Sequence, residues 1–270
     1  MKMTARVLAV VAVGCTLFSL TGCDKLRARD QLNKGVAAYK NAKYEEAIDH
    51  FQRSVAYDPG LLNAKLYLAT AYAQQFVPGV DTPDNNKNAD QAIKAYQDVL
   101  QQDPSNVNSV KGIAYLYLNM KKFDQAKEYY EKASKIDPND PEPYYSVGVI
   151  DWTQAFQNAK DTKGAQGIQV DDDISKNAKL CATLKDQNSA LVADGLDALN
   201  KALKLRPDYD DAMAYVNLTY RRKADLECGD PDARTADLKT ADEWVERTME
   251  TKKKNAQKHH SQNGEDQASQ

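Results

Sequence analysis

Apolar residues recur at helical spacing over residues 107–136, in two stretches separated by Lys121 and Lys122. Each stretch carries its apolar residues on one face, and the short polar break predicts a tight turn between two antiparallel helices. One such pair leaves its apolar stripe uncovered. The pattern therefore predicts that further helix pairs of the same kind lie on either side of it.

The same pattern recurs along the chain in a constant register. Each copy closes on a polar residue followed by proline, and a small or polar residue stands ten positions after that proline. The residue before a proline resists the helical conformation, so each step predicts the end of a helix. The four prolines are Pro59, Pro104, Pro138 and Pro207, and the four positions that follow are Ala69, Ala114, Gly148 and Asn217.

These offsets resemble the tetratricopeptide repeat, a helix–turn–helix unit of 34 residues with small, aromatic and proline positions at fixed places. The resemblance covers about Asp30 to Glu250 and implies an all-α fold, a right-handed α-solenoid of about five repeats. The alternative is an unrelated helical bundle. The expected repeats cover residues 28–59, 62–104, 107–138, 141–207 and 210–250.

Three of the expected repeats are longer than the others because residues are inserted at the turn between their paired helices. The inserts comprise about eleven residues in the second repeat, about 35 in the fourth and about twelve in the fifth. In the fourth, residues 152–158 are expected to extend the first helix, and residues 174–187 to form a further helix. In a solenoid all three inserts lie along one edge.

Two cysteines of the chain fall in neighbouring inserts, Cys181 in the fourth repeat and Cys228 in the fifth. Because the resemblance places both loops on one edge, we expect these thiols to form a disulfide. An exported protein in an oxidising compartment would retain such a bond. The alternative is a pair of separated thiols, because the sequence does not show the required Cα spacing.

The beginning of the chain has the pattern of a secretory signal. Lys2 and Arg6 precede an apolar run over residues 7–20, which is too short for a typical membrane-spanning helix. The run ends in Leu20-Thr21-Gly22-Cys23, which resembles a bacterial lipobox. The resemblance implies a signal peptide over residues 1–22 and a diacylglycerol on Cys23. The alternatives are an ordinary signal with a chance cysteine, or a segment that stays uncleaved as an anchor.

The lipobox resemblance also implies a location, the bacterial cell envelope on the periplasmic side of the inner or outer membrane. Residues 23–29 are expected to form a flexible lipidated tether to the solenoid. At the other end, residues 235–254 are expected to form a capping helix. The final segment, residues 251–270, lacks an apolar pattern and is expected to be disordered.

Composition and charge exclude several classes of function. The net charge is −3 with a pI near 5.7, so no basic surface points to nucleic acid. The three histidines are His50, His259 and His260, and none stands in a pattern typical of a nucleophile and its base. The sequence predicts no catalytic residue, no cofactor and no metal site. An enzyme with its site in the fourth-repeat insert remains an alternative.

The tetratricopeptide resemblance implies a groove lined by the first helices of the repeats, which binds a protein or peptide partner. Rigid aromatic side chains with one polar end are suited to such binding. The alternatives are that several of the tyrosines pack between repeats, or that the groove binds an envelope glycan or other ligand. The expected groove residues are Tyr39, Tyr67, Lys111, Tyr115, Tyr145, Trp152, Tyr215 and Arg222, with Asn63, Asn108 and Asn119 among them.

Overall fold

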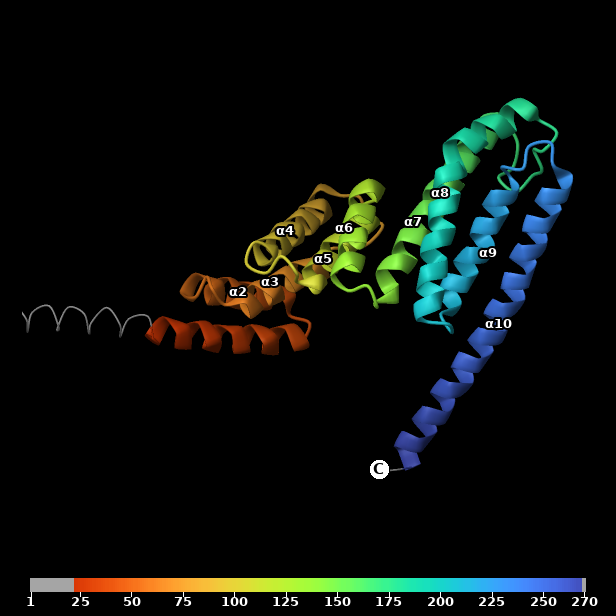
Figure 1. Cartoon of the computed structure of the whole chain (residues 1–270). Helices are drawn as coiled ribbons and strands as arrows, with labels where there is room; N and C mark the ends of the chain where they lie inside the picture. The colour runs from red at the N-terminus through yellow and green to blue at the C-terminus, as the bar shows by residue number, and fades with distance from the viewer. Residues whose placement is uncertain (1–21, 269–270) are drawn as a thin grey trace, which may run out of the picture. The chain divides into compact units, whose positions relative to one another are not determined.

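The computed structural model describes residues 22–268, with side chains up to residue 258 (Figure 1). This part of the chain is helical and contains no strand, which confirms the expected all-α fold. A first helix covers residues 22–40. It is followed by α2 (Tyr44–Tyr57), α3 (Leu62–Gln75), α4 (Pro83–Leu100), α5 (Val107–Asn119), α6 (Phe123–Ile136), α7 (Pro141–Gly164), α8 (Ala178–Leu205), α9 (Asp210–Ala224) and α10 (Pro231–Ala268).

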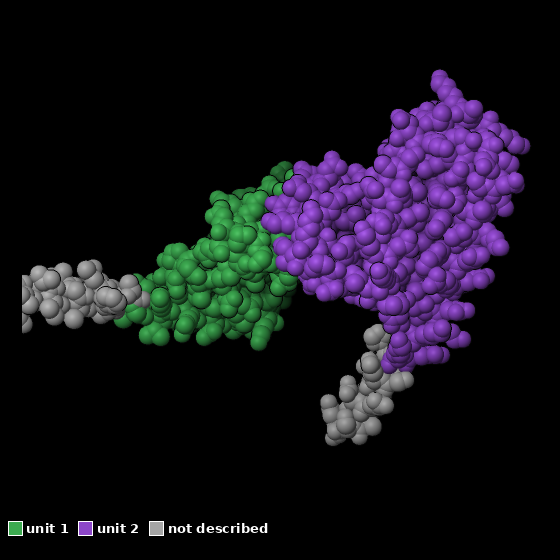
Figure 2. Space-filling view, in the orientation of Figure 1, with its two compact units in different colours: residues 1–122 green, residues 123–270 purple. Residues whose placement is uncertain are grey.

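The chain forms two compact units, residues 1–122 and residues 123–270 (Figure 2). The boundary falls in the turn between α5 and α6, at the polar break that separates the two apolar stretches of residues 107–136. The predicted signal peptide, residues 1–22, lies outside the described residues except for Gly22. Within residues 22–268, no helix combines the length and apolar character needed to cross a membrane.

The Asp-Pro steps end the helices by the same local chemistry each time. One carboxylate oxygen of Asp58 accepts the backbone N–H of Gly60 at 3.0 Å, and Asp103 and Asp137 accept from Ser105 and Asn139 at 3.1 Å. An aspartate that bonds the backbone two residues on stabilises a turn, and the intervening proline cannot continue the helix. Hydrogen bonds from the side chains of Ser105 and Asn106, together with that from the Ser105 backbone, lower the pKa of Asp103.

Two of the helices that follow these steps, α5 and α7, begin at polar capping residues. Asn106 Oδ1 accepts the N–H of Ser109 at 3.0 Å at the start of α5, and Asp140 Oδ1 accepts that of Glu142 at 3.0 Å at the start of α7. A cap of this kind satisfies a backbone donor that the helix itself leaves unpaired. The boundaries between repeats are thus encoded by residues within a few positions of each proline.

Unit 1 is held together by small residues placed against aromatic rings. Phe51 on α2 is fully buried, and a Cβ built on Gly35 would lie 2.5 Å from its ring. The first helix and α2 can approach this closely only because residue 35 has no side chain. Ala38, Ala47 and Ala71 complete the core around Phe51. The predicted pairing of small and aromatic positions is therefore present.

Unit 2 repeats this arrangement with longer helices. α7 packs along α8, α8 packs on α9, and α9 packs on α10 (Figure 1). Gly148 on α7 meets the buried Leu199 on α8, where a Cβ would lie 2.5 Å from Leu199 Cγ. The helix pair of the fourth repeat is therefore packed at the predicted small position.

The fourth-repeat insert mainly lengthens the two helices of that repeat. α7 has 24 residues and α8 has 28, and residues 165–177 between them, the repeat-four loop, complete the insert. The extensions have a hydrophobic core of their own, in which Ile174 packs with Leu180, Leu184 and Leu226. The insert is therefore an ordered part of unit 2, even though its sequence is polar.

Both ends of the described chain differ from the expectation. Residues 24–29 are helical, Ala28 is buried, and the Ser54 hydroxyl donates to the Ala28 carbonyl at 2.7 Å, so this segment packs on α2 and is not a flexible tether. α10 continues to Ala268 through the segment expected to be disordered. Its Asn255 side chain donates to the carbonyl of Asp208 at 3.1 Å. Contacts with other parts of the chain therefore hold residue 28 at one end and residues 255 and 258 at the other.

Candidate functional site

Five aromatic side chains of unit 2 form a continuous row across α7, α9 and the turn before α9. The ring centroids of Tyr145 lie 4.9 Å from Tyr209 and 5.8 Å from Tyr215. Trp152 lies 5.3 Å from Tyr215 and 5.2 Å from Phe156. All four distances fall within the range of favourable ring contacts. We call these residues, Tyr209, Tyr145, Tyr215, Trp152 and Phe156, the aromatic row.

The aromatic row is partly exposed to solvent, and its tyrosine hydroxyls are not ionised at neutral pH. Tyr145, Tyr215, Trp152 and Phe156 are half-buried, whereas Tyr209 is buried. Desolvation by burial raises the pKa of Tyr145, Tyr209 and Tyr215, so their hydroxyls stay protonated at neutral pH. The row therefore offers flat apolar faces together with neutral hydroxyl groups.

The expected groove residues of unit 1 are more dispersed. Tyr67 and Tyr115 are exposed, at 38% and 48%, whereas Tyr39 and Lys111 are half-buried. Tyr67 stacks on Phe51 with centroids 5.5 Å apart, and Tyr39 contacts Tyr44 edge to face. Unit 1 thus exposes two of the predicted aromatics but does not join them into a row.

Arg222, which was expected to line an accessible groove, is buried and only 5% exposed. Its Nη2 donates to Asp171 Oδ1 at 2.7 Å, and its Nη1 donates to the Val170 carbonyl at 3.0 Å and lies 3.1 Å from Asp225 Oδ2. Its guanidinium also stands over the Phe156 ring. The physical reason for the difference is that the repeat-four loop covers this arginine.

Lys163 belongs to the same buried network. Its side chain is fully buried, and Nζ donates to Asp225 Oδ1 at 2.9 Å and to the carbonyls of Val170 and Asp172 at 2.7 and 3.0 Å. A buried ammonium needs such partners because its desolvation is costly. Burial raises the pKa of Asp225, against the opposing effects of Arg222 and Lys163. The network fastens the repeat-four loop to α7 and α9.

A cavity of about 420 Å³ lies at the Phe156 end of the aromatic row. Its apolar wall consists of Trp152, Phe156, Leu218 and Leu238. Its charged wall consists of Arg221, Arg222, Arg234, Asp171 and Asp225. We call this cavity the arginine pocket. Its size is in the range that holds a small ligand or one or two peptide side chains.

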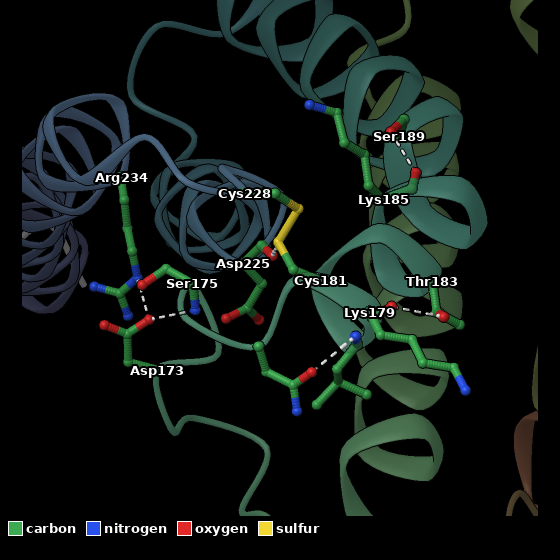
Figure 3. The surroundings of a disulfide bond; sticks show 12 residues. Asp173, Ser175, Lys179, Cys181, Thr183, Lys185, Ser189, Asp225, Cys228 and Arg234 are labelled. Carbon is green, nitrogen blue, oxygen red and sulfur yellow. Dashed lines mark hydrogen bonds and ion pairs between the residues drawn. A yellow bond between two sulfur atoms is a disulfide. The ribbon is translucent and has the colours of Figure 1, made fainter.

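A disulfide joins Cys181 in the first turn of α8 to Cys228 in the loop between α9 and α10, with Cα atoms 5.7 Å apart (Figure 3). The Cys181 sulfur lies 3.4 Å from the Asp225 carbonyl oxygen. Figure 3 also shows Arg234 directed at Asp173, whose Oδ1 accepts the N–H of Ser175. The pair expected from the sequence is thus bonded, and it contacts the backbone of Asp225, a residue that lines the arginine pocket.

A further buried ionisable group of unit 2 lies where α7 contacts α6. Asp151 on α7 is fully buried, and Lys127 on α6 donates to its Oδ1 at 2.8 Å. Desolvation raises the pKa of Asp151 to about 6, although the nearby ammonium opposes this shift. No group of His, Cys, Asp and Glu side chains suited to a metal ion is found among the described residues.

Several residues of the site were missed from the sequence. Phe156 follows Trp152 by one helical turn, so the helical spacing of the aromatics could have revealed it. The sequence contains no comparable pattern for Lys163, Asp225 and Arg234. Charged residues in or near a polar insert are usually exposed, so their place in the site was not expected. Only their contacts in the folded chain show that they belong together.

Comparisons with known proteins identify the repeats. Two family models described as tetratricopeptide repeat match residues 32–107 and 86–147. The Hsp70-Hsp90 organizing protein 3 of Arabidopsis thaliana is 26% identical over 119 residues. That match covers 44% of this chain and 19% of the plant protein, so the chain spans about a fifth of this curated relative.

Solved structures agree on the fold. One such structure is MamA from Desulfovibrio magneticus RS-1, residues 41 to the end. The alignment covers 84% of this chain and 96% of the MamA chain, with 16% identity and a TM-score of 0.56. YrrB, a tetratricopeptide-repeat protein described as having an unusual peptide-binding site, aligns over 84% and 90%, with 12% identity and a TM-score of 0.51. The chain therefore contains tetratricopeptide repeats, and its fold is an all-α tetratricopeptide-repeat solenoid.

Proposed function

We propose that this protein is an interaction scaffold that binds an extended peptide segment or a partner protein on the aromatic row of unit 2. The observation that carries the proposal is the unbroken series of ring contacts from Tyr209 to Phe156 on two adjacent helices. Four of its five rings are half-buried and so keep part of their surface in solvent. The exposed Tyr67 and Tyr115 offer further contacts on unit 1.

The physical reason is that these rings are already held in place by one another. An aromatic side chain contributes a large contact area and has few rotatable bonds, so it loses little conformational freedom on binding. Neutral tyrosine hydroxyls can both donate to and accept from a peptide backbone. A peptide laid across the row would therefore gain apolar contact and hydrogen bonds together. YrrB, with its peptide-binding site, is an analogy for this kind of activity.

We further propose that Cys23 carries a lipid and holds the protein at the bacterial cell envelope, on the extracytoplasmic side. Cys23 is exposed, and it is the one free cysteine among the described residues. The disulfide between Cys181 and Cys228 is consistent with an oxidising compartment. Because the helix over residues 22–40 begins beside Cys23, the lipid would be attached to a rigid element of unit 1.

Photo-crosslinking in intact cells tests the binding site. A photoreactive residue at position 218, beside the row, should form adducts with a protein, whereas one at the exposed position 185 on α8 should not. Trp152→Ala with Tyr215→Ala should abolish the adducts, and Tyr57→Ala, which removes an exposed tyrosine of unit 1, should leave them unchanged. Absence of protein adducts at 218, together with saturable binding of a purified envelope glycan, would replace the proposal with the glycan alternative.

Metabolic labelling with a fatty acid tests the anchor independently. The wild-type protein should incorporate label and fractionate with membranes. Cys23→Ser should lose both properties, whereas Cys181→Ala with Cys228→Ala should keep the label. Label retained by Cys23→Ser would show that the lipid assignment is wrong, and it would leave the binding site on unit 2 unaffected.

A further inference from the structure

The arginine pocket lies where the aromatic row ends, and its walls differ in chemistry. Trp152 and Phe156 belong to both features, so a chain lying on the row reaches the pocket without a break. We infer that the pocket binds an acidic side chain of the bound peptide, with a neighbouring apolar residue against Leu218 and Leu238. This inference rests on the proposed function and adds the chemistry of the segment that is selected.

Wall residues of the pocket are held in place by other parts of the chain before any ligand binds. The buried network of Lys163, Arg222 and Asp225 holds one of its walls, and the Cys181 sulfur of the disulfide lies 3.4 Å from the Asp225 carbonyl oxygen. Arg222 is only 5% exposed, donates to the Val170 carbonyl and to Asp171, and pairs with Asp225. Its role is therefore to position the wall, and it is not available to the ligand. A preformed site binds with a smaller loss of conformational freedom than a site that must be ordered.

The carboxylates of the pocket do not favour a cationic ligand. Both oxygens of Asp225 face cations, Lys163 at 2.9 Å and Arg222 at 3.1 Å. Asp171 is paired with Arg222 at 2.7 Å. A lysine or arginine entering the pocket would meet two paired carboxylates and three guanidinium groups. The charges of the wall therefore disfavour it.

The other two arginines keep donors for a ligand. Arg234 lies 3.2 Å from Asp173 through Nε, and its two terminal nitrogens donate no hydrogen bond to the described residues. Arg221 uses Nε for Asn217 and Nη2 for Asp242, which leaves Nη1. Guanidinium groups match a carboxylate in geometry as well as in charge. The pocket therefore presents N–H donors in excess of its acceptors.

Asp242 and Asp173, the carboxylates that pair with Arg221 and Arg234, would compete only weakly with a ligand carboxylate. The side chain of Asp242 is 70% exposed and that of Asp173 is 51% exposed. Ion pairs at such exposure contribute about 0–1 kcal/mol, because water and salt screen them. A ligand carboxylate placed against Trp152 and Phe156 would be better shielded from solvent, so its attraction to the guanidinium groups would be stronger.

Selection from a random dodecapeptide display library tests the inference. The bait is the full mature chain with Cys23→Ser, which removes the lipid and leaves both units intact. We expect the selected peptides to share an aspartate or glutamate next to an apolar residue. Against the bait that also carries Arg221→Gln and Arg234→Gln, the apolar preference should persist and the acidic preference should disappear.

A synthetic selected peptide and its carboxamide analogue then give the size of the effect. The wild-type chain should prefer the acidic peptide by at least tenfold, and the preference should shrink at high salt. In the double arginine variant the ratio should fall to about one, whereas Arg53→Gln, which removes an exposed arginine of unit 1, should leave it unchanged. Circular dichroism melting confirms that each variant is folded.

The possible failures are distinct. Peptides enriched without an acidic preference, or an acidic preference that survives the arginine substitutions, would overturn the inference and leave the proposed function standing. Failure to enrich any peptide, with the wild-type bait folded, would overturn both.

Discussion

Gly148 on α7 lies directly against Leu199 on α8, and no side chain can be placed between them. A Cβ on residue 148 would lie 2.5 Å from Leu199 Cγ and 3.1 Å from the carbonyl oxygen of Gly195. Leu199 is fully buried, so it has no free space into which it could turn. The long helix pair of the fourth repeat therefore depends on this close approach.

Gly148→Ala should lower the free energy of unfolding by about 1–3 kcal/mol, because the added methyl group forces the two helices apart. The measurement is thermal unfolding followed by circular dichroism. Gly164→Ala, at the end of the same helix, is the matched control, since a Cβ there meets nothing within 4 Å. It should leave the Tm equal or slightly higher. Equal Tm values for the two variants would contradict the packing argument.

Lys163→Met should destabilise unit 2 by about 3–5 kcal/mol, the usual cost of breaking a buried ion pair from one side. The substitution leaves the carbonyls of Val170 and Asp172 without their donor, and Asp225 with Arg222 as its remaining cation. Lys160→Met, at an exposed position one turn earlier, should have little effect. Hydrogen exchange of residues 165–177 provides a local measurement. Unchanged protection of this loop would show that Lys163 does not hold it.

The disulfide between Cys181 and Cys228 should stabilise unit 2 by about 2–4 kcal/mol, because it restricts the unfolded chain. Dithiothreitol should lower the Tm of the wild type to that of Cys181→Ala with Cys228→Ala. The double variant itself should not respond to the reductant. Thiol titration of the denatured mature chain, residues 23–270 with Cys23→Ser and so without Cys15, should find no free thiol. Two free thiols would disprove the bond.

Asp151 should make stability depend on pH in a specific direction. Burial raises its pKa from 3.8 to about 6, so between these values the unfolded chain releases a proton that the folded protein retains. The stability contributed by this group is therefore complete below about pH 4 and is lost as the pH rises past 6.

Asp151→Asn does not titrate, so its free energy of unfolding relative to the wild type should rise between pH 4 and pH 7, by on the order of 1–3 kcal/mol. Urea unfolding at several pH values measures this difference. Asp194→Asn, which removes an exposed carboxylate near Lys127, should show no such trend. A difference that stays constant with pH would mean that Asp151 is ionised throughout this range.

Much of the fold is visible in the sequence, because the signals that define the repeats are local. Asp103 and Pro104 end a helix and Asn106 starts the next one, all within four positions. The small positions mark where paired helices approach closely, as the contact of Gly35 with Phe51 shows. Once this register was known, it also placed Cys181 and Cys228 in neighbouring inserts, although Cys181 lies in the first turn of α8.

The candidate site follows from the sequence only in part. Tyr145, Trp152 and Tyr215 were expected in the groove, and they meet in the aromatic row because helical spacing places them on facing sides of α7 and α9. The helical order of residues 24–29 and of the segment beyond residue 251 was not expected. It depends on contacts such as that of Ser54 with Ala28, which join residues far apart in the chain.

The sequence by itself determined the boundaries between repeats, the repeat register and the aromatic positions, since each depends on residues within about one repeat of one another. Only the tertiary structure decided which charged residues in and near the fourth-repeat insert are buried. Lys163, Arg222 and Asp225 come from separate parts of the chain, and their burial is favourable only when all three meet. No local sequence pattern shows that these three residues must meet. A prediction from periodicity therefore leaves them exposed to solvent, whereas the folded chain buries them together.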